Sequence, residues 1–449
     1  MADILQLQHL RAVEVDDQGD HYRIAAEGTL TPFMCEHCGA NGFHGHGHIR
    51  QSYIDTPIHG KRVLLEIDRK RYRCKICGKT MFQPMPDIDD KRLATRRLVK
   101  FIEDRCTKLT FAELSRQVGV DDKTIRHIFD DYSSRMALTV KFETPVVLGI
   151  DEIKVVGQYR CVITNIQELS LFDILPSRKK AELIPYFKHL PDKKNVRAIV
   201  MDLWSVYRQV ADECFPGVPV VADKFHVVRM ANEAIEKSRK AVRKQLNTRQ
   251  RLKLKDDRFL LLAKADNLSE PNREKLAEWK ETFPELGACH EAKERFFSIF
   301  DATSRADAAE RLDSWKEELD PLARQHFQFV LTAVDNWRNE ILNMFDVPVS
   351  NGYTESLNNL IKGMNRMGRG YSFEVLRARM LYDEIARQPT RKVIRRKVQS
   401  SGTSAGMSDM MGRGIFKGEA GGFQTIEQAI EYGPHIPQLV ELLERGHFS

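Results

Sequence analysis

The sequence predicts a multidomain α/β protein in which a mixed sheet and a long helical region follow two small N-terminal modules. Three observations support this fold class. Strand-like runs between residues 146 and 222 are first consecutive and then alternate with helical stretches, which is typical of a mixed sheet. Residues 224–346 are almost wholly helical in pattern. A pair of CxxCG motifs and a helix-turn-helix pattern precede the sheet.

The composition is that of a globular chain that buries a sizeable core. The 449 residues, 42% hydrophobic and 30% charged, allow about three domains and exclude a small disulfide-stapled scaffold. No run approaches the ~18 apolar residues of a membrane span. The first residues lack the layout of a secretory signal, so we expect a cytoplasmic protein with reduced thiols. The eight cysteines are therefore interpreted as metal ligands or core residues.

The distribution of charge indicates a phosphate-binding surface near the N-terminus. The net charge is +7, and residues 61–141 contain 20 Lys and Arg against 12 Asp and Glu. A local excess of positive charge is the footprint of nucleic-acid binding. Charge alone leaves open the alternative of an ordinary solvated surface.

The first module, predicted over residues 1–90, carries four cysteines with the spacing of a metal site, which are Cys35, Cys38, Cys74 and Cys77. Two residues between paired cysteines let both thiolates of a tight turn face one tetrahedral ion, and the following glycine permits a positive φ. The matched pair of motifs predicts one structural Zn²⁺. Two unrelated turns with buried thiols are the alternative.

Other histidines and cysteines have weaker patterns. His44, His46 and His48 lie between the two motifs, where they could replace a thiolate, bind phosphate or simply be exposed on a Gly-rich hairpin, the interpretation we favour. The remaining cysteines lack metal-site spacing and are expected in the core; they are Cys106, Cys161, Cys214 and Cys289.

The second module, predicted over residues 91–143, has a helix-turn-helix pattern. Thr110 and Glu113 resemble a capping box, Gly119 can close the first helix, and Asp121 can cap the second. An apolar nucleus holds the helices at an angle: Phe111, Leu114, Val118, Val120, Ile125 and Ile128. We expect DNA-binding side chains on the early, outer part of the second helix, at Lys123, Thr124 and Arg126. An ordinary αα-hairpin is the alternative.

A break at residues 143–145 predicts a linker into the α/β domain. Strand-like runs cover residues 146–150, 159–166, 169–175, 196–201 and 218–222, with helical stretches at 179–190 and 203–214. We expect Trp279, Trp315 and Trp337 to pack between helices, and a further helix to start near Asn351. Residues 401–422 are predicted flexible, and 424–445 a short helical piece.

Three carboxylates of the α/β domain stand out. Asp151 and Asp202 each end an apolar run, so each can project from the end of a separate strand. Glu355 lies on a predicted helix whose apolar stripe is Leu357, Leu360, Ile361 and Met364 and whose polar stripe is Glu355, Asn359 and Lys362. Three converging carboxylates are what two hard divalent ions need, and two such ions promote in-line phosphoryl displacement.

Neighbouring polar residues are competing candidates for the same site. Glu152 follows Asp151, but strand alternation points it to the other face. Asp223 ends another strand-like run and is either a metal ligand or the N-cap of the next helix. His226 is expected near the same rim, which makes both residues accessory to the site.

Four blocks of the chain resemble the signature motifs of the ISL3 family of bacterial insertion-sequence transposases: residues 151–154 (DEIK), 202–207 (DLWSVY), 223–226 (DKFH) and 350–362 (SNGYTESLNNLIK). The cysteine motifs and the helix-turn-helix resemble that family's N-terminal modules, in the same order. The resemblance implies a DDE catalytic domain of ribonuclease-H-like fold, interrupted by a helical insertion. It also implies that Asp151, Asp202 and Glu355 are catalytic and hold Mg²⁺, with two ions expected.

The resemblance gives the remaining expectations. The catalytic domain would span residues 144–230 and 347–390, around an insertion at 231–346, with a basic and Gly/Ser-rich tail at 391–449. The partner would be double-stranded DNA at terminal inverted repeats, bound by a homodimer or larger assembly at the nucleoid of a bacterium, with Lys362 as a further DNA contact. The alternatives are a DNA-binding regulator derived from a transposase and a Mg²⁺-dependent nuclease without strand transfer.

Overall fold

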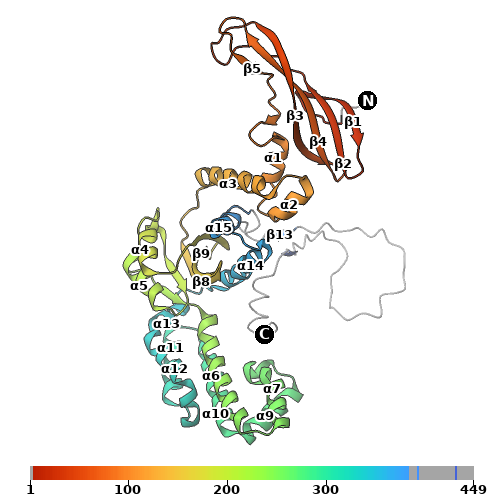
Figure 1. Ribbon diagram of the computed structural model, residues 1–449. Coiled ribbons are helices and arrows are strands. Elements are labelled where there is room, and N and C mark those ends of the chain that lie inside the picture. The colour runs from red at the N-terminus through yellow and green to blue at the C-terminus, as the bar shows by residue number, and fades with distance from the viewer. Residues whose placement is uncertain (1–3, 384–391, 394–429, 432–449) are drawn as a thin grey trace, which may run out of the picture.

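The computed structural model describes residues 4–383 and two short strands, β13 (Lys392–Val393) and β14 (Ile430–Glu431). Figure 1 shows an N-terminal sheet, a small helical module, a second sheet and a group of helices in succession along the molecule. The predicted flexible segment 401–422 lies outside the described residues. So does the predicted helical piece 424–445, except at β14, where the chain is a strand and not a helix. None of the described helices has both the length and the hydropathy of a membrane span.

The N-terminal sheet has the strand order β1-β2-β4-β3-β7-β6, with β5 paired to β4. Its strands are β1 (Leu10–Asp17), β2 (His21–Gly28), β3 (Phe43–Ile58), β4 (Lys61–Cys74), β5 (Thr80–Phe82), β6 (Ile88–Asp89) and β7 (Ala94–Thr95). Alternate apolar residues of β3 and β4, among them Tyr53 and Leu65, are buried in its core. The first half of β3 is exposed, so the β3–β4 hairpin continues beyond this core as a ribbon ending at Cys74, where β5 pairs with the last residues of β4.

Three helices form the next module: α1 (Arg96–Glu103), α2 (Phe111–Val118) and α3 (Asp122–Thr139). The predicted turn is confirmed, because Gly119 ends α2 with a φ of 78° and Asp121 Oδ1 accepts hydrogen bonds from the first amides of α3 at 3.0 Å. All six residues of the predicted apolar nucleus are buried in one cluster. The sequence pattern therefore folds as a helix-turn-helix.

The predicted capping box of α2 is only half formed. Thr110 Oγ1 accepts a hydrogen bond from the Glu113 amide at 3.1 Å. The Glu113 carboxylate does not return to the backbone of Thr110, since it accepts a hydrogen bond from Gln117 Nε2 at 2.9 Å and pairs with Arg116. On this exposed helix face, partners one turn away are within easier reach of the carboxylate than the N-cap amide.

The second sheet has the order β10-β9-β8-β11-β12. Its strands are β8 (Val147–Val155), β9 (Gln158–Asn165), β10 (Ser170–Leu175), β11 (Ala198–Met201) and β12 (Val220–Ala222). The first three strands pair antiparallel, and β11 lies parallel between β8 and β12. This is the mixed, ribonuclease-H-like sheet that the strand-like runs and the resemblance predict.

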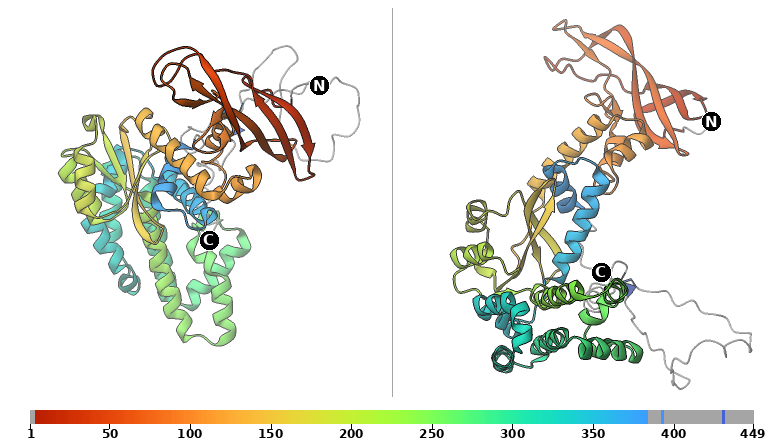
Figure 2. Two further views of the ribbon diagram at one scale, coloured as in Figure 1. Left: turned by 45° about the horizontal axis from the view of Figure 1, so that its top comes forward. Right: turned by 60° about the horizontal axis from the view of Figure 1, so that its bottom comes forward.

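Helices cover both faces of this sheet, as Figure 2 shows. On one face, α4 (Lys180–Lys188) and α5 (Ser205–Cys214) pack on inward residues such as Leu148 and Ile163. On the other, α14 (Gly352–Gly368) and α15 (Phe373–Tyr382) pack on Ile153, Val162 and their neighbours. The sheet is thus buried on both sides, and α14 returns to it from far along the chain.

The helical region between the sheet and α14 contains α6 (Lys224–Gln245), α7 (Thr248–Asp256), α8 (Arg258–Leu262), α9 (Glu270–Thr282), α10 (Pro284–Ser298), α11 (Arg305–Glu317), α12 (Pro321–Asn336) and α13 (Arg338–Asp346). The three predicted core tryptophans, Trp279, Trp315 and Trp337, are buried among these helices. The chain comes back at the edge of the sheet, where Asn343 of α13 donates a hydrogen bond to the Val220 carbonyl at 2.7 Å.

A buried arginine joins α15 to the helix-turn-helix. The Arg379 guanidinium is fully buried and donates hydrogen bonds to the carbonyls of Leu109 and Thr107 at 2.8 and 2.9 Å, in the segment between α1 and α2. It also donates to the Tyr371 hydroxyl at 2.6 Å, and the Tyr371 ring packs 5.3 Å from that of Phe111. Helix α15, which packs on the second sheet, therefore also packs against the helix-turn-helix.

Candidate active site

Three aspartates lie side by side at one edge of the second sheet. In the parallel pairing of β8, β11 and β12, Ile150, Met201 and Ala222 are partners in register. Asp151, Asp202 and Asp223 each follow one of these residues. Because parallel strands carry successive residues to the same edge, the three carboxylates gather where β11 and β12 end.

Helix α14 brings Glu355 to this edge. A Cβ atom at Gly149 of β8 would lie 2.3 Å from Thr164 Oγ1 and 2.7 Å from Asn351 Oδ1, so only glycine allows the start of α14 to approach the strand. Thr354 completes the contact, with its hydroxyl 2.7 Å from Thr164 Oγ1. Glu355 is half-buried, and its pKa is raised first by burial and then by the charge of Asp223.

Asn358, on the same face of α14 as Glu355, fixes Asp151. Its Nδ2 donates a hydrogen bond to Asp151 Oδ2 at 2.6 Å, and the Glu152 amide donates to Asp151 Oδ1 at 2.7 Å. Burial and the charge of Asp202 raise the pKa of Asp151 well above its usual range. The sequence analysis did not single out Asn358, although its spacing of three residues from Glu355 places both on one helix face.

His226, in the first turn of α6, lies between two aspartates. Its Nδ1 is hydrogen-bonded to Asp223 Oδ2 at 3.0 Å and lies 2.7 Å from Asp202 Oδ1. Burial lowers the pKa of His226, but the two carboxylates outweigh that effect and raise it to about 10. The Nδ1 atom carries a single proton, and the hydrogen bond to Asp223 uses it. Asp202 Oδ1 is therefore buried without a hydrogen bond of good geometry.

The donor set fits a divalent cation. Asp202, Asp223 and His226 place ligand atoms within 4.8 Å of one another, while Asp151 and Glu355 lie around this tight group. One protonated His226, shared between Asp202 and Asp223, does not balance the charge of the four carboxylates gathered here, which is costly unless a further cation neutralises them. Carboxylate oxygens are the ligands that Mg²⁺ prefers. Asp223 also caps α6, accepting a hydrogen bond from the Phe225 amide at 3.3 Å, so its N-cap interpretation is confirmed.

Of the other positions predicted near the site, Glu152 lies as expected and Leu360 does not. Glu152 points to the opposite face, as alternation predicts, and pairs there with Arg178. The predicted apolar stripe of α14 is wrong at Leu360, which is 46% exposed. The residues of α14 that pack against β8 and α15 are Leu357 and Ile361, and Leu360 lies outside this contact. Lys362 is exposed, two helical turns beyond Glu355.

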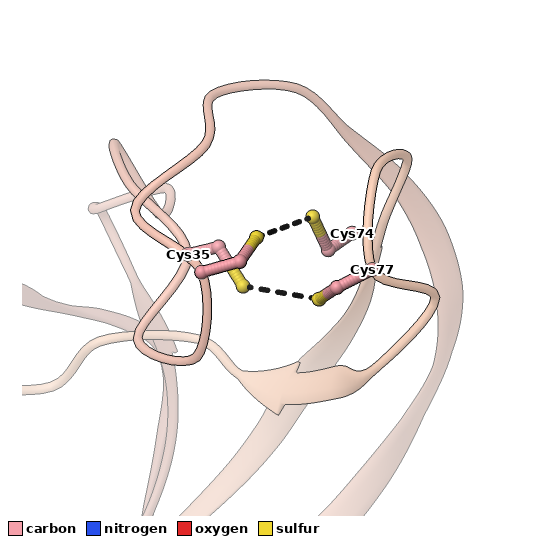
Figure 3. Close-up of side chains that lie close together, drawn as sticks. Cys35, Cys74 and Cys77 are labelled. Atoms are coloured by element: carbon pink, nitrogen blue, oxygen red, sulfur yellow. Dashed lines mark hydrogen bonds between the residues drawn. The ribbon is translucent and has the colours of Figure 1, made fainter.

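The four predicted zinc ligands meet at the end of the β3–β4 ribbon. Sγ atoms of Cys35 and Cys77, and of Cys38 and Cys74, are 3.7 Å apart, and all four lie within 4.8 Å of one another (Figure 3). A tetrahedron with Zn–S bonds of about 2.3 Å has edges of about 3.8 Å, so the separations fit one Zn²⁺. Gly39 and Gly78 follow the two motifs with φ values of 72° and 71°, as predicted.

Neighbouring residues complete this part of the molecule. His44, His46 and His48 lie on exposed positions of β3 and outside the cysteine cluster, so the hairpin interpretation is confirmed. In the Cys74 turn, amides of the motif itself, above all that of Cys77, lower the pKa of the Cys74 thiol to about 6. The four remaining cysteines are buried, as expected of core residues.

Comparison with known proteins then decides the family. A family model described as transposase, of the ISL3 DDE type, matches residues 148–380, which is more than half of the chain. The chain belongs to the ISL3 family of DDE transposases. Models described as the zinc finger of the IS204, IS1001, IS1096 and IS1165 transposases and as the helix-turn-helix domain of the ISL3 family match residues 31–77 and 83–133.

Individual relatives of this ISL3 transposase agree with the family models. It is 22% identical over 366 residues to the transposase for insertion sequence element IS1001 of Bordetella parapertussis, covering 79% of the chain and 89% of the relative. It is 23% identical over 396 residues to the transposase for IS1557 of Mycobacterium tuberculosis, covering 80% and 87%. The ISL3 transposase is thus a DNA phosphoryltransferase with a zinc ribbon, a helix-turn-helix and a family requirement for divalent metal.

Proposed function

We propose that this transposase binds the terminal inverted repeats of an insertion sequence through its zinc ribbon and helix-turn-helix, and cleaves and joins DNA strands at the acidic cluster. The observation that carries the proposal is the gathering of Asp151, Asp202 and Glu355 at one sheet edge, next to the cation-binding geometry of Asp223 and His226. These residues come from three strands and from α14, which lie far apart in the sequence, so only the tertiary fold brings them together.

Each residue has a definable part in this proposal. Asp151, Asp202 and Glu355 would hold Mg²⁺. Burial raises the pKa of Asp151 and of Glu355, and the charge of a neighbouring aspartate raises each further, so a bound cation would stabilise their charged forms. Two bound Mg²⁺ ions would polarise the scissile phosphate and lower the pKa of the attacking water or 3′-hydroxyl. Asn358 and His226 are positioning residues, since they orient the carboxylates of Asp151, Asp202 and Asp223.

The direct test is incubation of the full chain and Mg²⁺ with DNA carrying candidate insertion-sequence ends, followed by mapping of cleaved and joined strands. Cleavage at the ends with joining to a second duplex supports the proposal. Binding without cleavage would instead identify a regulator, and cleavage without joining would identify a nuclease.

The remaining assignments are part of the same proposal. The zinc-binding module would span residues 1–90, the helix-turn-helix 91–143, the catalytic domain 144–230 and 347–390, the insertion 231–346 and the tail 391–449. The active form on DNA would be a homodimer or a larger assembly, at the bacterial nucleoid in the cytoplasm where the DNA substrate lies.

The helix-turn-helix makes a separate prediction about binding. Lys123 and Arg126 are exposed on the first turns of α3, whereas the Thr124 hydroxyl already donates a hydrogen bond to Asp121 Oδ2 at 2.6 Å. Lys123→Ala and Arg126→Ala should each weaken binding to the repeats and lower the salt dependence by about one phosphate contact. Fluorescence anisotropy at several KCl concentrations measures both, with Lys108→Ala before α2 as control. Unchanged binding in both variants would move recognition away from α3.

A second prediction concerns Asn358. Replacing it by Ala removes the donor to Asp151, so the Mg²⁺ concentration for half-maximal cleavage should rise about 10- to 100-fold, the usual cost of losing an outer partner of a metal ligand. Titrating Mg²⁺ in a cleavage assay measures the change. Asn359→Ala, one position along and exposed, is the matched control. An unchanged Mg²⁺ requirement would show that Asn358 serves only the packing of α14.

A further inference from the structure

The helical region from α6 to α13, which contains the proposed insertion, separates its charges into two parts. Residues 224–258, which include α6 and α7, contain twelve Lys and Arg against four Asp and Glu. Residues 259–346 contain eleven Lys and Arg against eighteen Asp and Glu. One end of the insertion is therefore strongly basic, although the insertion as a whole is close to neutral.

The two parts also differ in how their cations are paired. In the acidic part, nine of the eleven Lys and Arg side chains form ion pairs with carboxylates. In the basic part, within the range that the structure describes, six side chains have no carboxylate at ion-pair distance and no aromatic ring beneath them: Lys240, Arg243, Lys244, Arg249, Arg251 and Lys255. We call these six residues the basic cluster. All but the half-buried Arg243 are exposed.

Helix stability explains only part of the basic cluster. Lys240 and Lys244, and likewise Arg251 and Lys255, are like charges four residues apart, an arrangement that destabilises a helix. Cations in the last turn of α6 interact favourably with the helix dipole, which accounts for Arg243 and Lys244. The same dipole opposes Arg249 and Arg251 at the start of α7. A polyanion bound along both helices would remove this repulsion.

Helix α6 connects the basic cluster to the active-site edge. Helix α6 begins directly after Asp223 and carries His226 in its first turn, so its 22 residues lead away from the acidic cluster over about 33 Å. Figures 1 and 2 show α7 on the same side of the second sheet as α14, opposite α4 and α5. A duplex whose scissile phosphate lies at the acidic cluster would reach Lys240 and Lys244 within about one helical turn of DNA.

We infer that the basic cluster of α6 and α7 is a second DNA-binding surface, which holds the phosphate backbone of duplex DNA next to the cleaved end. This inference rests on the proposed function for the direction of the DNA, but not for the binding itself. The contact is to phosphates, because lysine and arginine on exposed helix faces without groove-reading geometry recognise charge rather than sequence.

The experiment compares the full chain with the double variant Lys240→Gln/Lys255→Gln, which removes one cation from each helix. The probe is a mixed-sequence duplex of 40 base pairs, titrated by fluorescence anisotropy between 50 and 200 mM KCl. Each lost phosphate contact lowers the slope of log affinity against log salt by about 0.9, so the slope should fall by about 2 and the loss of affinity should shrink as KCl rises.

The matched control is Lys275→Gln/Arg324→Gln, which removes two exposed, unpaired cations from the acidic part. Its slope should equal that of the unmodified chain. Equal slopes for all three proteins would overturn the inference. This outcome is independent of the proposed function, because the salt slope measures binding and requires no cleavage. If the unmodified chain failed to cleave insertion-sequence ends, a reduced slope in the variant would still show a lost DNA contact.

Discussion

Asp151→Asn, Asp202→Asn and Glu355→Gln should each reduce strand cleavage and joining by at least about 1,000-fold, which corresponds to roughly 4 kcal/mol of transition-state stabilisation. Each change keeps the shape of the side chain and removes the charge that Mg²⁺ requires. DNA binding should be largely retained, since the helix-turn-helix and the zinc ribbon lie outside the acidic cluster. A strand-mapping assay and an anisotropy titration on the same preparations separate the two properties.

Exposed acids supply the controls for this result. Asp212→Asn on α5 and Glu374→Gln on α15 also remove one charge each, without touching the cluster, and should be fully active. Asp223→Asn separates the helix cap of that residue from its contribution of charge to the acidic cluster. Asparagine caps a helix as well as aspartate does, so the substitution removes only the charge. Full strand transfer by the Glu355→Gln protein would contradict the assignment of α14 to the active site.

Cys74→Ser should abolish zinc binding and unfold the tip of the β3–β4 ribbon. Structural zinc contributes about 10–16 kcal/mol in small zinc domains, far more than the exposed half of the ribbon can obtain from its own packing. Metal analysis should find one zinc per unmodified chain and none in the variant. The second sheet has a separate core, so its thermal unfolding should be retained.

Cys214→Ala is the control for the zinc experiment, because this buried cysteine lies in the second sheet's core and outside the cluster. Its zinc content should equal that of the unmodified chain. Full zinc content in the Cys74→Ser protein, with the other three cysteines open to alkylation, would show that the four thiols do not share one ion.

Local pattern predicted most of the elements and fewer of their contacts. The strand-like runs at residues 146–222 correspond to β8–β12, because apolar runs and flanking turn residues act within a few positions of each other. Parallel pairing of β8 with β11 depends on residues about fifty positions apart, and that pairing is what brings Asp151 beside Asp202.

The missed features share a physical cause. Asn358 and Arg379 are polar residues whose partners lie far along the chain, at Asp151 and at Leu109, so no spacing in the sequence pairs them with these partners. Leu360 has the periodicity of a buried residue, but the narrow contact between α14 and the sheet leaves it exposed. Burial of a helix stripe is set by the width of the neighbouring surface, which periodicity does not encode.

The buried hydrogen bonds of Arg379 have a geometric consequence. They tie the helix-turn-helix to α15. Helix α15 follows α14, the helix that carries Glu355, and is in contact with it. Under the proposed function, the helix-turn-helix that binds the repeat and the carboxylates that cleave the strand would therefore be held at a fixed separation. That separation, expressed in base pairs, would set the distance between the recognised bases and the bond that is broken.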